Sequence, residues 1–298
     1  MSKFKRILLK LSGEALAGEK GHGIDNVILS DMASEIASIV KQGVQVALVI
    51  GGGNLVRGIS ASAGGMNRAQ GDAMGMLGTV MNGLAMQDAL DKQGVDSVVM
   101  SAIRMEPVCE FFDRRKALKL LSAGSVVIFS AGTGNPFFTT DSCAALRAIE
   151  SECDVIMKAT KVDGIYTADP VKDPTATRFD DISYKEVISL GLKVMDTAAV
   201  ALCMENNMPI FVFKMEKGNL TRAAINGDLG TLVHCESVAR QLAANKTHQL
   251  LLKTSRKHPL PGVFFLSQGR WPVLSNVEVS LAKCPYCHAA CHPGLSLS

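Results

Sequence analysis

Residues 44–54 read VQVALVIGGGN, in which a short apolar and largely β-branched run, Val44–Ile50, ends in three consecutive glycines. Such a run is typical of a strand buried in a parallel sheet, with a turn that leads into the next helix. Gly51, Gly52 and Gly53 let the backbone approach a ligand, and consecutive N–H groups can form an anion-binding concavity. A plain tight turn is the alternative, but it rarely needs three glycines. The stretch therefore favours a phosphate site directly after a strand.

The residues around this stretch repeat the alternation of strand and helix. Five further short apolar runs predict strands at Ile7–Leu11, Ser97–Met100, Val126–Ser130, Val155–Lys158 and Ile210–Phe213. Amphipathic stretches between most of them predict helices at Ser30–Gln42, Asp72–Lys92, Asp113–Ser122, Asp141–Glu150 and Asp196–Asn206. This alternation predicts an α/β fold with a mostly parallel central sheet covered on both faces. Ligands of such sheets bind beyond the carboxyl ends of the strands, so loops that follow strands are the candidate sites.

One such loop follows the strand Ile7–Leu11 and reads KLSGE at residues 10–14. Lys10 lies among apolar strand residues, where a lysine costs desolvation energy unless an anion meets it. A Ser-Gly turn comes directly after it. Lys10 is thus a candidate phosphate ligand, and the alternative is an edge-strand lysine that points to solvent.

Two later loops combine polar donors with aromatic side chains. The loop at 132–141, GTGNPFFTTD, follows the strand Val126–Ser130, and its Thr-Thr-Asp end can cap the next helix. Two adjacent phenylalanines between polar donors favour a pocket wall over core aromatics in a capped turn. The loop at 158–170, KATKVDGIYTADP, carries two lysines and an aromatic ring, which suit a polyanion joined to a planar base. An ordinary hairpin at Asp163-Gly164 is the alternative for this loop.

Composition and absent motifs limit the classes of function. Of the 298 residues, 47% are hydrophobic and 20% are charged, which excludes a disordered or fibrous chain. No apolar run reaches the roughly 18 residues that cross a bilayer, and the start lacks a signal-peptide core, so we expect a cytoplasmic protein without a membrane span. The eight cysteines then predict reduced thiols. The sequence contains no G-x-x-x-x-G-K-[ST], G-x-S-x-G or H-E-x-x-H motif, and Phe137 interrupts a G-x-G-x-x-G match that begins at Gly132.

The composition changes near residue 240, which divides the chain into a body, residues 1–236, and an extension, residues 237–298. From residue 246 to the end, six Lys or Arg residues stand against one acidic residue, and five of the ten prolines lie there. We expect the extension to be poorly ordered, either as a tail or as the product of a shifted reading frame. A zinc site is the alternative, although a second C-x-x-C is missing. Its ligands would include Cys284, Cys287 and Cys291. The positive charge predicts weak attraction to nucleic acid at most and no specific nucleic-acid partner.

The whole body resembles bacterial-type uridylate kinase of the amino-acid kinase superfamily, from residue 5 to about Glu236. Several long strings carry the resemblance, and they occur in the expected order: KRILLKLSGEAL at 5–16, VIGGGNLVRG at 49–58, GMNRAQGDAMGML at 65–77, TVMNGLAM at 79–86, SAGTGNPFFTTD at 130–141, KATKVDGIYTADPVKDPTAT at 158–177 and KVMD at 193–196. The resemblance ends near a final strand at Gly230–Val233, and residues 237–298 match nothing in it.

The resemblance implies a three-layer αβα sandwich of the amino-acid kinase type. It implies transfer of the γ-phosphoryl group of MgATP to UMP, giving UDP and ADP, with Mg²⁺ brought by ATP and no separate metal site in the protein. It further implies a homohexamer that GTP activates and UTP inhibits.

The roles of individual residues are implied by the same resemblance. The catalytic candidates are Lys10, Arg57, Asp141 and Asp196. The first two would meet phosphate charge, and the two aspartates would orient lysines or the Mg²⁺ shell. The ATP contacts fall on Lys10, Leu11, Ser12, Gly13, Gly53, Arg57, Thr160, Tyr166 and Asp169. The UMP contacts fall on Gly52, Asp72, Thr133, Gly134, Asn135, Pro136, Phe137, Phe138, Thr139 and Thr140. The allosteric segment falls on Gly18, Glu19, Lys20, Gly21, His22 and Gly23.

Two other functions remain open on the sequence. One is a related amino-acid kinase that acts on a carboxylate or carbamate, against which the paired phenylalanines of the 132–141 loop argue. The other is a nucleotide-binding storage or regulatory protein, such as the molybdenum-storage proteins that resemble this family. The intact Lys10, Arg57 and Asp141 favour an enzyme over a storage or regulatory protein.

Overall fold

The structure is a computed structural model that describes residues 3–56, 65–170, 172–227 and 229–235. The chain divides into two units, Met1–Lys246 and Thr247–Ser298, and every described residue belongs to the first. Arg57 and the extension with its cysteine cluster lie outside the described residues. The boundary near residue 236 therefore stays a prediction.

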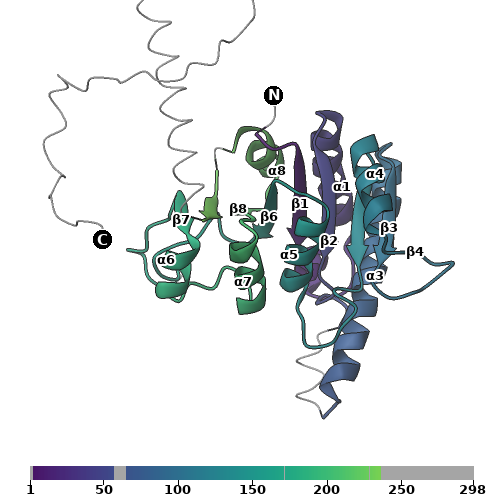
Figure 1. Cartoon of the computed structure of the whole chain (residues 1–298), viewed down its shortest axis with the longest axis horizontal. Coiled ribbons are helices and arrows are strands. Elements are labelled where there is room, and N and C mark those ends of the chain that lie inside the picture. Colours follow the sequence, from purple (N-terminus) through teal and green to yellow (C-terminus); the bar gives the residue numbers. More distant parts are fainter. Residues whose placement is uncertain (1–2, 57–64, 171, 228, 236–298) are drawn as a thin grey trace, which may run out of the picture. The chain divides into compact units, whose positions relative to one another are not determined.

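Nine strands of the described part form one sheet, in the order β4-β3-β5-β2-β1-β6-β8-β9-β7 (Figure 1). The strands are β1 Arg6–Leu11, β2 Gln45–Ile50, β3 Ser97–Ser101, β4 Glu110–Phe111, β5 Val126–Ser130, β6 Val155–Thr160, β7 Asp181–Ser183, β8 Ile210–Lys214 and β9 Thr231–His234. Every neighbouring pair is parallel except β8 and β9. The carboxyl ends of the central strands β1, β2, β5 and β6 thus meet at one edge of the sheet.

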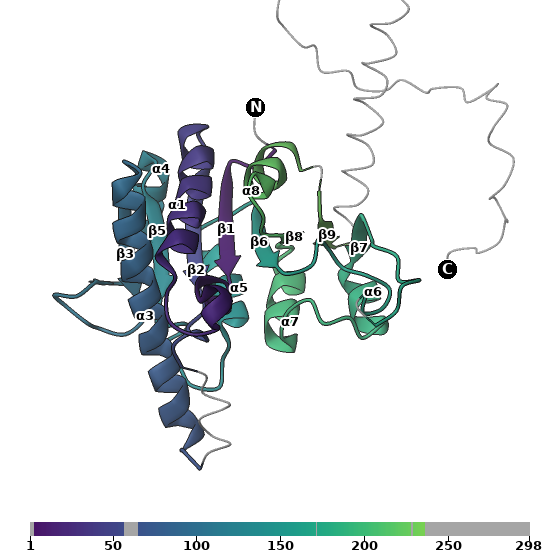
Figure 2. The same ribbon diagram turned by 180° about the vertical axis from the view of Figure 1, so that it is seen from behind.

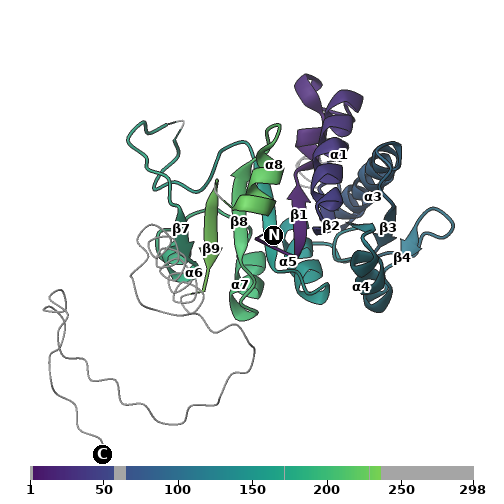
Figure 3. The ribbon, with the colours of Figure 1, turned by 90° about the horizontal axis from the view of Figure 1, so that it is seen from above.

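Helices cover both faces of the sheet and make three layers (Figure 3). One face carries α1 (Asn26–Lys41), α3 (Arg68–Lys92) and α8 (Asn219–Thr221). The other face carries α4 (Arg114–Ala123), α5 (Thr140–Glu150), α6 (Tyr184–Ser189) and α7 (Thr197–Glu205). Short helical turns form η1 (Gly13–Leu16), η2 (Gly18–Lys20) and η3 (Arg222–Asn226). A separate hydrophobic core lies between the sheet and each helix layer. The predicted three-layer αβα sandwich is confirmed.

β1 contributes to both cores, because successive side chains of a strand point to opposite faces. Ile7, Leu9 and Leu11 are buried in the core shared with α1, whereas Leu8 is buried in the core shared with α5. Lys10 has the same parity as Leu8 and is only 9% exposed, so it faces the α5 layer. β1 pairs with β2 on one side and with β6 on the other. The alternative of an edge-strand lysine that points to solvent is therefore wrong.

The predicted and observed elements differ mainly at their ends and at the margins of the sheet. α1 begins four residues before the predicted Ser30, because Asp25 accepts hydrogen bonds from the N–H groups of Val27 and Ile28. The sequence pattern does not predict β4, β7 or α6, since each is too short to form a recognisable apolar run. The final strand expected near Gly230–Val233 is present as β9.

The cysteines of the described part form no disulfide bonds with one another. They are Cys109, Cys143, Cys153, Cys203 and Cys235. Burial raises the pKa of Cys143 to about 11 and that of Cys153 to about 12, so both thiols stay protonated at neutral pH. Within the described residues, no helix combines the length and the apolar composition that crossing a membrane requires.

A chain cut after Glu236 keeps every described strand and helix. We therefore expect it to stay folded, with the same oligomeric state as the full chain and a Tm close to or above that of the full chain. A thermal melt followed by circular dichroism, together with light scattering, measures both properties. Aggregation or dissociation of this shorter chain would show that the extension stabilises the body and would contradict the predicted boundary.

A cut after Asn226 is the matched control for this experiment. It removes β9, which pairs with both β7 and β8 and buries Thr231, Leu232 and Val233. We expect the control chain to aggregate, because β7 loses its partner and the core loses a covering strand.

Candidate active site

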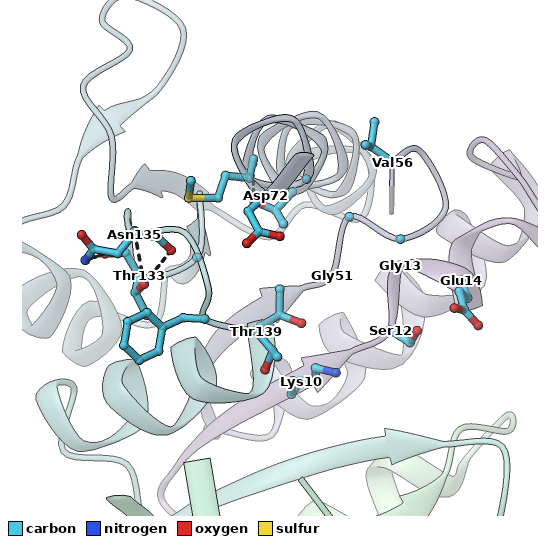
Figure 4. Close-up of a pocket in the computed structure, with 18 residues that line it drawn as sticks. Lys10, Ser12, Gly13, Glu14, Gly51, Val56, Asp72, Thr133, Asn135 and Thr139 are labelled. Carbon is cyan, nitrogen blue, oxygen red and sulfur yellow. Dashed lines mark hydrogen bonds between the residues drawn. The ribbon is translucent and has the colours of Figure 1, made fainter. Parts of the chain in front are cut away.

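Four segments meet around a cavity of about 250 Å³ at the carboxyl edge of the sheet (Figure 4). They are the end of β1, the glycine loop after β2, the first half of α3 and the loop between β5 and α5. The cavity brings together eleven of the residues that the sequence predicts: Lys10, Ser12, Gly13, Gly52, Gly53, Asp72, Thr133, Asn135, Phe138, Thr139 and Thr140. Figure 4 shows Asp72 on one side and Lys10 and Thr139 on the other.

Two lysine ammonium groups flank the carboxylate of Asp141 beside this cavity. Lys10 Nζ lies 2.7 Å from Asp141 Oδ1, and Lys158 Nζ lies 2.7 Å from Asp141 Oδ2. Lys158 also donates to the carbonyl oxygen of Val194 at 2.6 Å. None of the three charged side chains is more than 16% exposed. With Asp141 ionised, the group as a whole keeps one positive charge, which suits a phosphate.

The register of the sheet explains why an acid must lie between these lysines. Lys10 and Lys158 are direct partners in the pairing of β1 with β6, so their side chains leave the same face of the sheet side by side. Like charges opposite one another destabilise a sheet. Burial alone would raise the pKa of Asp141, but the charges of Lys10 and Lys158 outweigh it and hold that pKa below its ordinary value. Burial is the largest influence on the pKa of Lys158 and lowers it, and the charge of Asp141 opposes this effect.

Among the described residues, the hydrogen bonds of Asp196 hold the start of α5 and not a lysine, although its charge also opposes the burial that lowers the pKa of Lys158. It caps α7 by accepting a hydrogen bond from the N–H of Ala199. It also accepts hydrogen bonds from the hydroxyl groups of Thr139 and Ser142. Thr139 in turn caps α5 by accepting from the N–H groups of Asp141 and Ser142. Asp196 therefore fixes the helix that carries Asp141.

The glycine loop lies against two other backbones, which gives its glycines a packing role besides ligand binding. A Cβ on Gly52 would lie 2.5 Å from the carbonyl oxygen of Gly75 on α3. A Cβ on Gly13 would lie 2.3 Å from the carbonyl oxygen of Gly51. Contacts this short exclude any larger residue unless the backbone moves. Close packing against α3 therefore requires glycine at Gly52 whether or not a ligand binds there.

Asp72 connects α3 to the loop that follows β5. Its carboxylate accepts a hydrogen bond from the N–H of Phe137 at 2.8 Å and forms an ion pair with Arg68 Nε at 2.9 Å. Phe137 has a φ of 71°, in the left-handed region that non-glycine residues rarely adopt. Thr79 makes a second connection, because its hydroxyl accepts from the N–H of Ala131 at 2.7 Å. These contacts hold the 132–138 loop over the cavity.

A second cavity, of about 530 Å³, opens next to Lys158. The predicted ATP residues Thr160, Tyr166 and Asp169 line it together with the apolar side chains of Leu192, Val194 and Val212. The loop there is not a tight hairpin at Asp163-Gly164. An isolated antiparallel bridge joins Tyr166 to Arg178 instead. The Tyr166 hydroxyl donates to Asp163 at 2.6 Å, which raises the pKa of the tyrosine.

Some predicted residues lie outside both cavities. The side chain of Leu11 is fully buried in the α1 core, and Gly134, Pro136 and Phe137 are not part of either lining. The segment Gly18–Gly23 lies apart from the cavities and is joined to the glycine loop by hydrogen bonds between Gly23 and Asn54.

The cavity also has lining residues to which the sequence analysis gave no individual role. Glu14, Gly51 and Gly132 belong to loops that the sequence marks as candidate sites, whereas Val56, Gly75, Met76 and Thr79 were not predicted. Three of them, Gly75, Met76 and Thr79, follow Asp72 on α3 within two turns. Residues at this spacing lie on the same face of a helix as Asp72, which is itself a predicted site residue. That spacing is the signal that could have identified Gly75, Met76 and Thr79.

Replacing Asp141 by Asn should destabilise the protein by about 3–5 kcal/mol at neutral pH, because it leaves two buried lysines without their anion. The native pKa of Asp141 is lowered, so its stabilisation is present above the unfolded value of 3.8 and is lost as the pH falls through the native pKa. The difference in unfolding free energy between the wild type and the Asp141→Asn variant should therefore shrink below about pH 4. Urea titrations at several pH values measure it, and a constant difference down to about pH 2 would contradict the ion-pair account.

Comparison with known proteins agrees with this geometry. The model of the amino acid kinase family matches residues 5–214. A uridylate kinase from Parabacteroides distasonis is 56% identical over 235 residues, which span 78% of this chain and all of the relative. A uridylate kinase from Pseudomonas paraeruginosa is 59% identical over 232 residues, which span 78% of this chain and 95% of the relative. The crystal structure of UMP kinase from Bacillus anthracis superposes with a TM-score of 0.76 at 38% identity, covering 78% of this chain and 97% of that one. The chain therefore belongs to the amino acid kinase family and, within it, to the uridylate kinases.

Proposed function

We propose that the chain transfers the γ-phosphoryl group of MgATP to the phosphate of UMP, giving UDP and ADP. The observation that carries the proposal is the Lys10–Asp141–Lys158 group between two cavities. Lys10 lines the first cavity and Lys158 lines the second. UMP fits the first, where Asp72 and the Thr139 and Thr140 hydroxyls offer partners for ribose and phosphate. The base of ATP fits the second, beside Tyr166.

The chemistry needs charge compensation more than proton transfer. The phosphate of UMP is largely a dianion at neutral pH, so its oxygen can attack the γ-phosphorus without a general base. The barrier lies in bringing two polyanions together and in stabilising the charge that spreads over the moving phosphoryl group. Lys10 supplies a buried cation there, and Asp141 keeps it in place. The N–H groups of the glycine loop supply further donors, and we assign Arg57 to the same task.

Mg²⁺ is expected to arrive with ATP rather than in a site of the protein. Among the described residues, no group of three or more His, Cys, Asp or Glu side chains could hold a metal ion. Asp141 and Asp196 already accept hydrogen bonds or ion pairs from protein groups. Mg²⁺ commonly keeps several waters and binds through substrate phosphates with few carboxylates, so this donor set suits an ATP-borne ion. When bound, the ion neutralises phosphate charge.

We infer a homohexamer in the cytoplasm, activated by GTP and inhibited by UTP, from the family resemblance. The surface of α3 supports assembly. Met74, Leu77 and Met81 recur at helical spacing on this helix and are 41–56% exposed, which is typical of a surface that another subunit covers. Figure 2 shows α3 running past the carboxyl edge of the sheet. The segment Gly18–Gly23 is the proposed effector-linked part.

An assay of UMP-dependent ADP release tests the proposed function. UMP should be turned over, whereas acetylglutamate, aspartate and carbamate should not. GTP and UTP added to the same assay test the proposed effectors. Binding of ATP without any UDP formation would favour a nucleotide-binding storage or regulatory protein instead.

Lys10→Ala should lower kcat by roughly 10²–10³-fold, the size of effect seen when comparable electrostatic contacts are removed. The KM for UMP should change much less, because Lys10 makes its contact mainly in the transition state. Steady-state kinetics with both substrates varied separates kcat from KM. Lys92→Ala is the matched control, since Lys92 pairs with Asp88 on the exposed side of α3. Near-normal turnover of the Lys10 variant would remove Lys10 from the mechanism.

CMP should be a much poorer substrate than UMP, because the two bases differ in the exocyclic group and ring edge that the 132–140 loop would face. If donors of that loop form hydrogen bonds with the edge of uracil, CMP leaves these donors unpaired. Unpaired buried donors can lower kcat/KM by roughly 10⁴-fold. The ratio of kcat/KM for the two nucleotides is the measurement. Equal values would contradict base recognition by this loop.

A further inference from the structure

Two buried asparagines form a closed pair of side-chain amides behind the glycine loop. Asn54 ends that loop and is 4% exposed, and Asn82 lies on α3 and is fully buried. The amide nitrogen of Asn82 donates to Asn54 Oδ1 at 2.7 Å, and the amide nitrogen of Asn54 donates to Asn82 Oδ1 at 3.1 Å. Buried polar groups need such partners, and this pair provides them reciprocally.

Each amide uses its second N–H on a backbone carbonyl. Asn82 Nδ2 donates to the carbonyl oxygen of Gly51 at 2.7 Å, and Asn54 Nδ2 donates to the carbonyl oxygen of Gly23 at 2.7 Å. The amide orientations follow from this, because turning either group around would set an oxygen against a carbonyl oxygen. Asn82 therefore holds the Gly51 carbonyl in one direction.

The direction of that carbonyl sets the direction of the next N–H. Gly51 C=O and Gly52 N–H belong to one trans peptide group, in which the two bonds point opposite ways. With the carbonyl fixed toward Asn82, the Gly52 N–H is turned away from that side chain, and Gly52 lines the cavity proposed for UMP. Within the described residues, the N–H groups of Gly52 and Gly53 have no protein acceptor. They are therefore available to a phosphate.

Asn54 adds a connection to the segment Gly18–Gly23. Besides the side-chain bond to the Gly23 carbonyl, the N–H of Gly23 donates to the backbone carbonyl of Asn54 at 3.0 Å. The end of that segment and the glycine loop are thus held together at two points, next to the amide pair.

We propose that Asn82 is a positioning residue for phosphate binding, which orients the Gly51–Gly52 peptide so that the Gly52 N–H meets the phosphate of the acceptor nucleotide. Asn54 completes the unit by holding the Asn82 amide in the required orientation. The inference rests on the proposed function for the identity of the nucleotide, UMP, and on the hydrogen bonds above for the role of Asn82.

Asn82→Asp and Asn54→Asp test the proposal as a matched pair, because each places one carboxyl group in the same buried site at nearly unchanged volume. An ionised carboxylate at position 82 cannot donate to the Gly51 carbonyl, although it still accepts from Asn54. A carboxylate at position 54 still accepts from Asn82, so the bond to Gly51 is kept. Calorimetric titration with UMP should show a Kd raised roughly tenfold for Asn82→Asp, from the lost donor, and a clearly smaller change for Asn54→Asp.

The affinity for ATP and the Tm distinguish positioning from general damage. We expect the ATP affinity of Asn82→Asp to change less than its UMP affinity. Asn219→Asp, in the distant α8, is the control for a new acidic residue. Equal losses of UMP affinity, ATP affinity and Tm in both buried variants would overturn the proposal, as would an Asn82→Asp variant that binds UMP like the wild type.

A measurement on the unmodified chain keeps the proposal testable if Asn82→Asp does not fold. With ¹⁵N-glycine labelling, the Gly52 amide signal should shift strongly when UMP is added, and an unmoved signal would overturn the proposal. The proposed reaction is judged separately by UDP formation in the wild type. If the wild type makes UDP while Asn82→Asp binds UMP normally, the positioning role alone fails.

Discussion

The pairing of β1 with β6 places two buried lysines side by side, and the rest of the site depends on how their charge is met. Lys10 and Lys158 are register partners, and Asp141 reaches both ammonium groups from the start of α5. Without that carboxylate, both ammonium groups would lack their anionic partner in a largely buried site, which is energetically costly. The acid leaves one positive charge uncompensated, beside the two cavities. A phosphoryl group that passes from one polyanion to another needs a cation at such a point.

The position of Asp141 is itself fixed by helix capping. Thr139 caps α5 and Asp196 caps α7, and the Thr139 hydroxyl connects the two caps. A shift of either helix would therefore move the carboxylate relative to the lysines. Asp196 is thus connected to the Asp141 carboxylate through Thr139 and Ser142 at the start of α5.

Close backbone packing decides the other side of the cavity. Gly13 lies against Gly51, and Gly52 lies against Gly75 on α3, at separations that leave no room for a Cβ. The turn after β1, the glycine loop and α3 can therefore lie in direct backbone contact, although they come from different parts of the sequence. The buried amide of Asn82 then satisfies the carbonyl group of Gly51, which this packing takes out of water.

The sequence by itself determined the α/β class, the central strands and the four post-strand loops, because apolar runs and glycine turns are local signals. It also indicated most of the residues that line the first cavity, through the family strings. The tertiary structure alone decided that Lys10 and Lys158 are neighbours, since strand order and register are set by packing between distant segments. It alone revealed the Asn54–Asn82 pair, because nothing in the spacing of two asparagines 28 residues apart indicates that their amides meet. The marginal strands β4 and β7 were likewise decided by pairing, as they are too short to carry a pattern of their own.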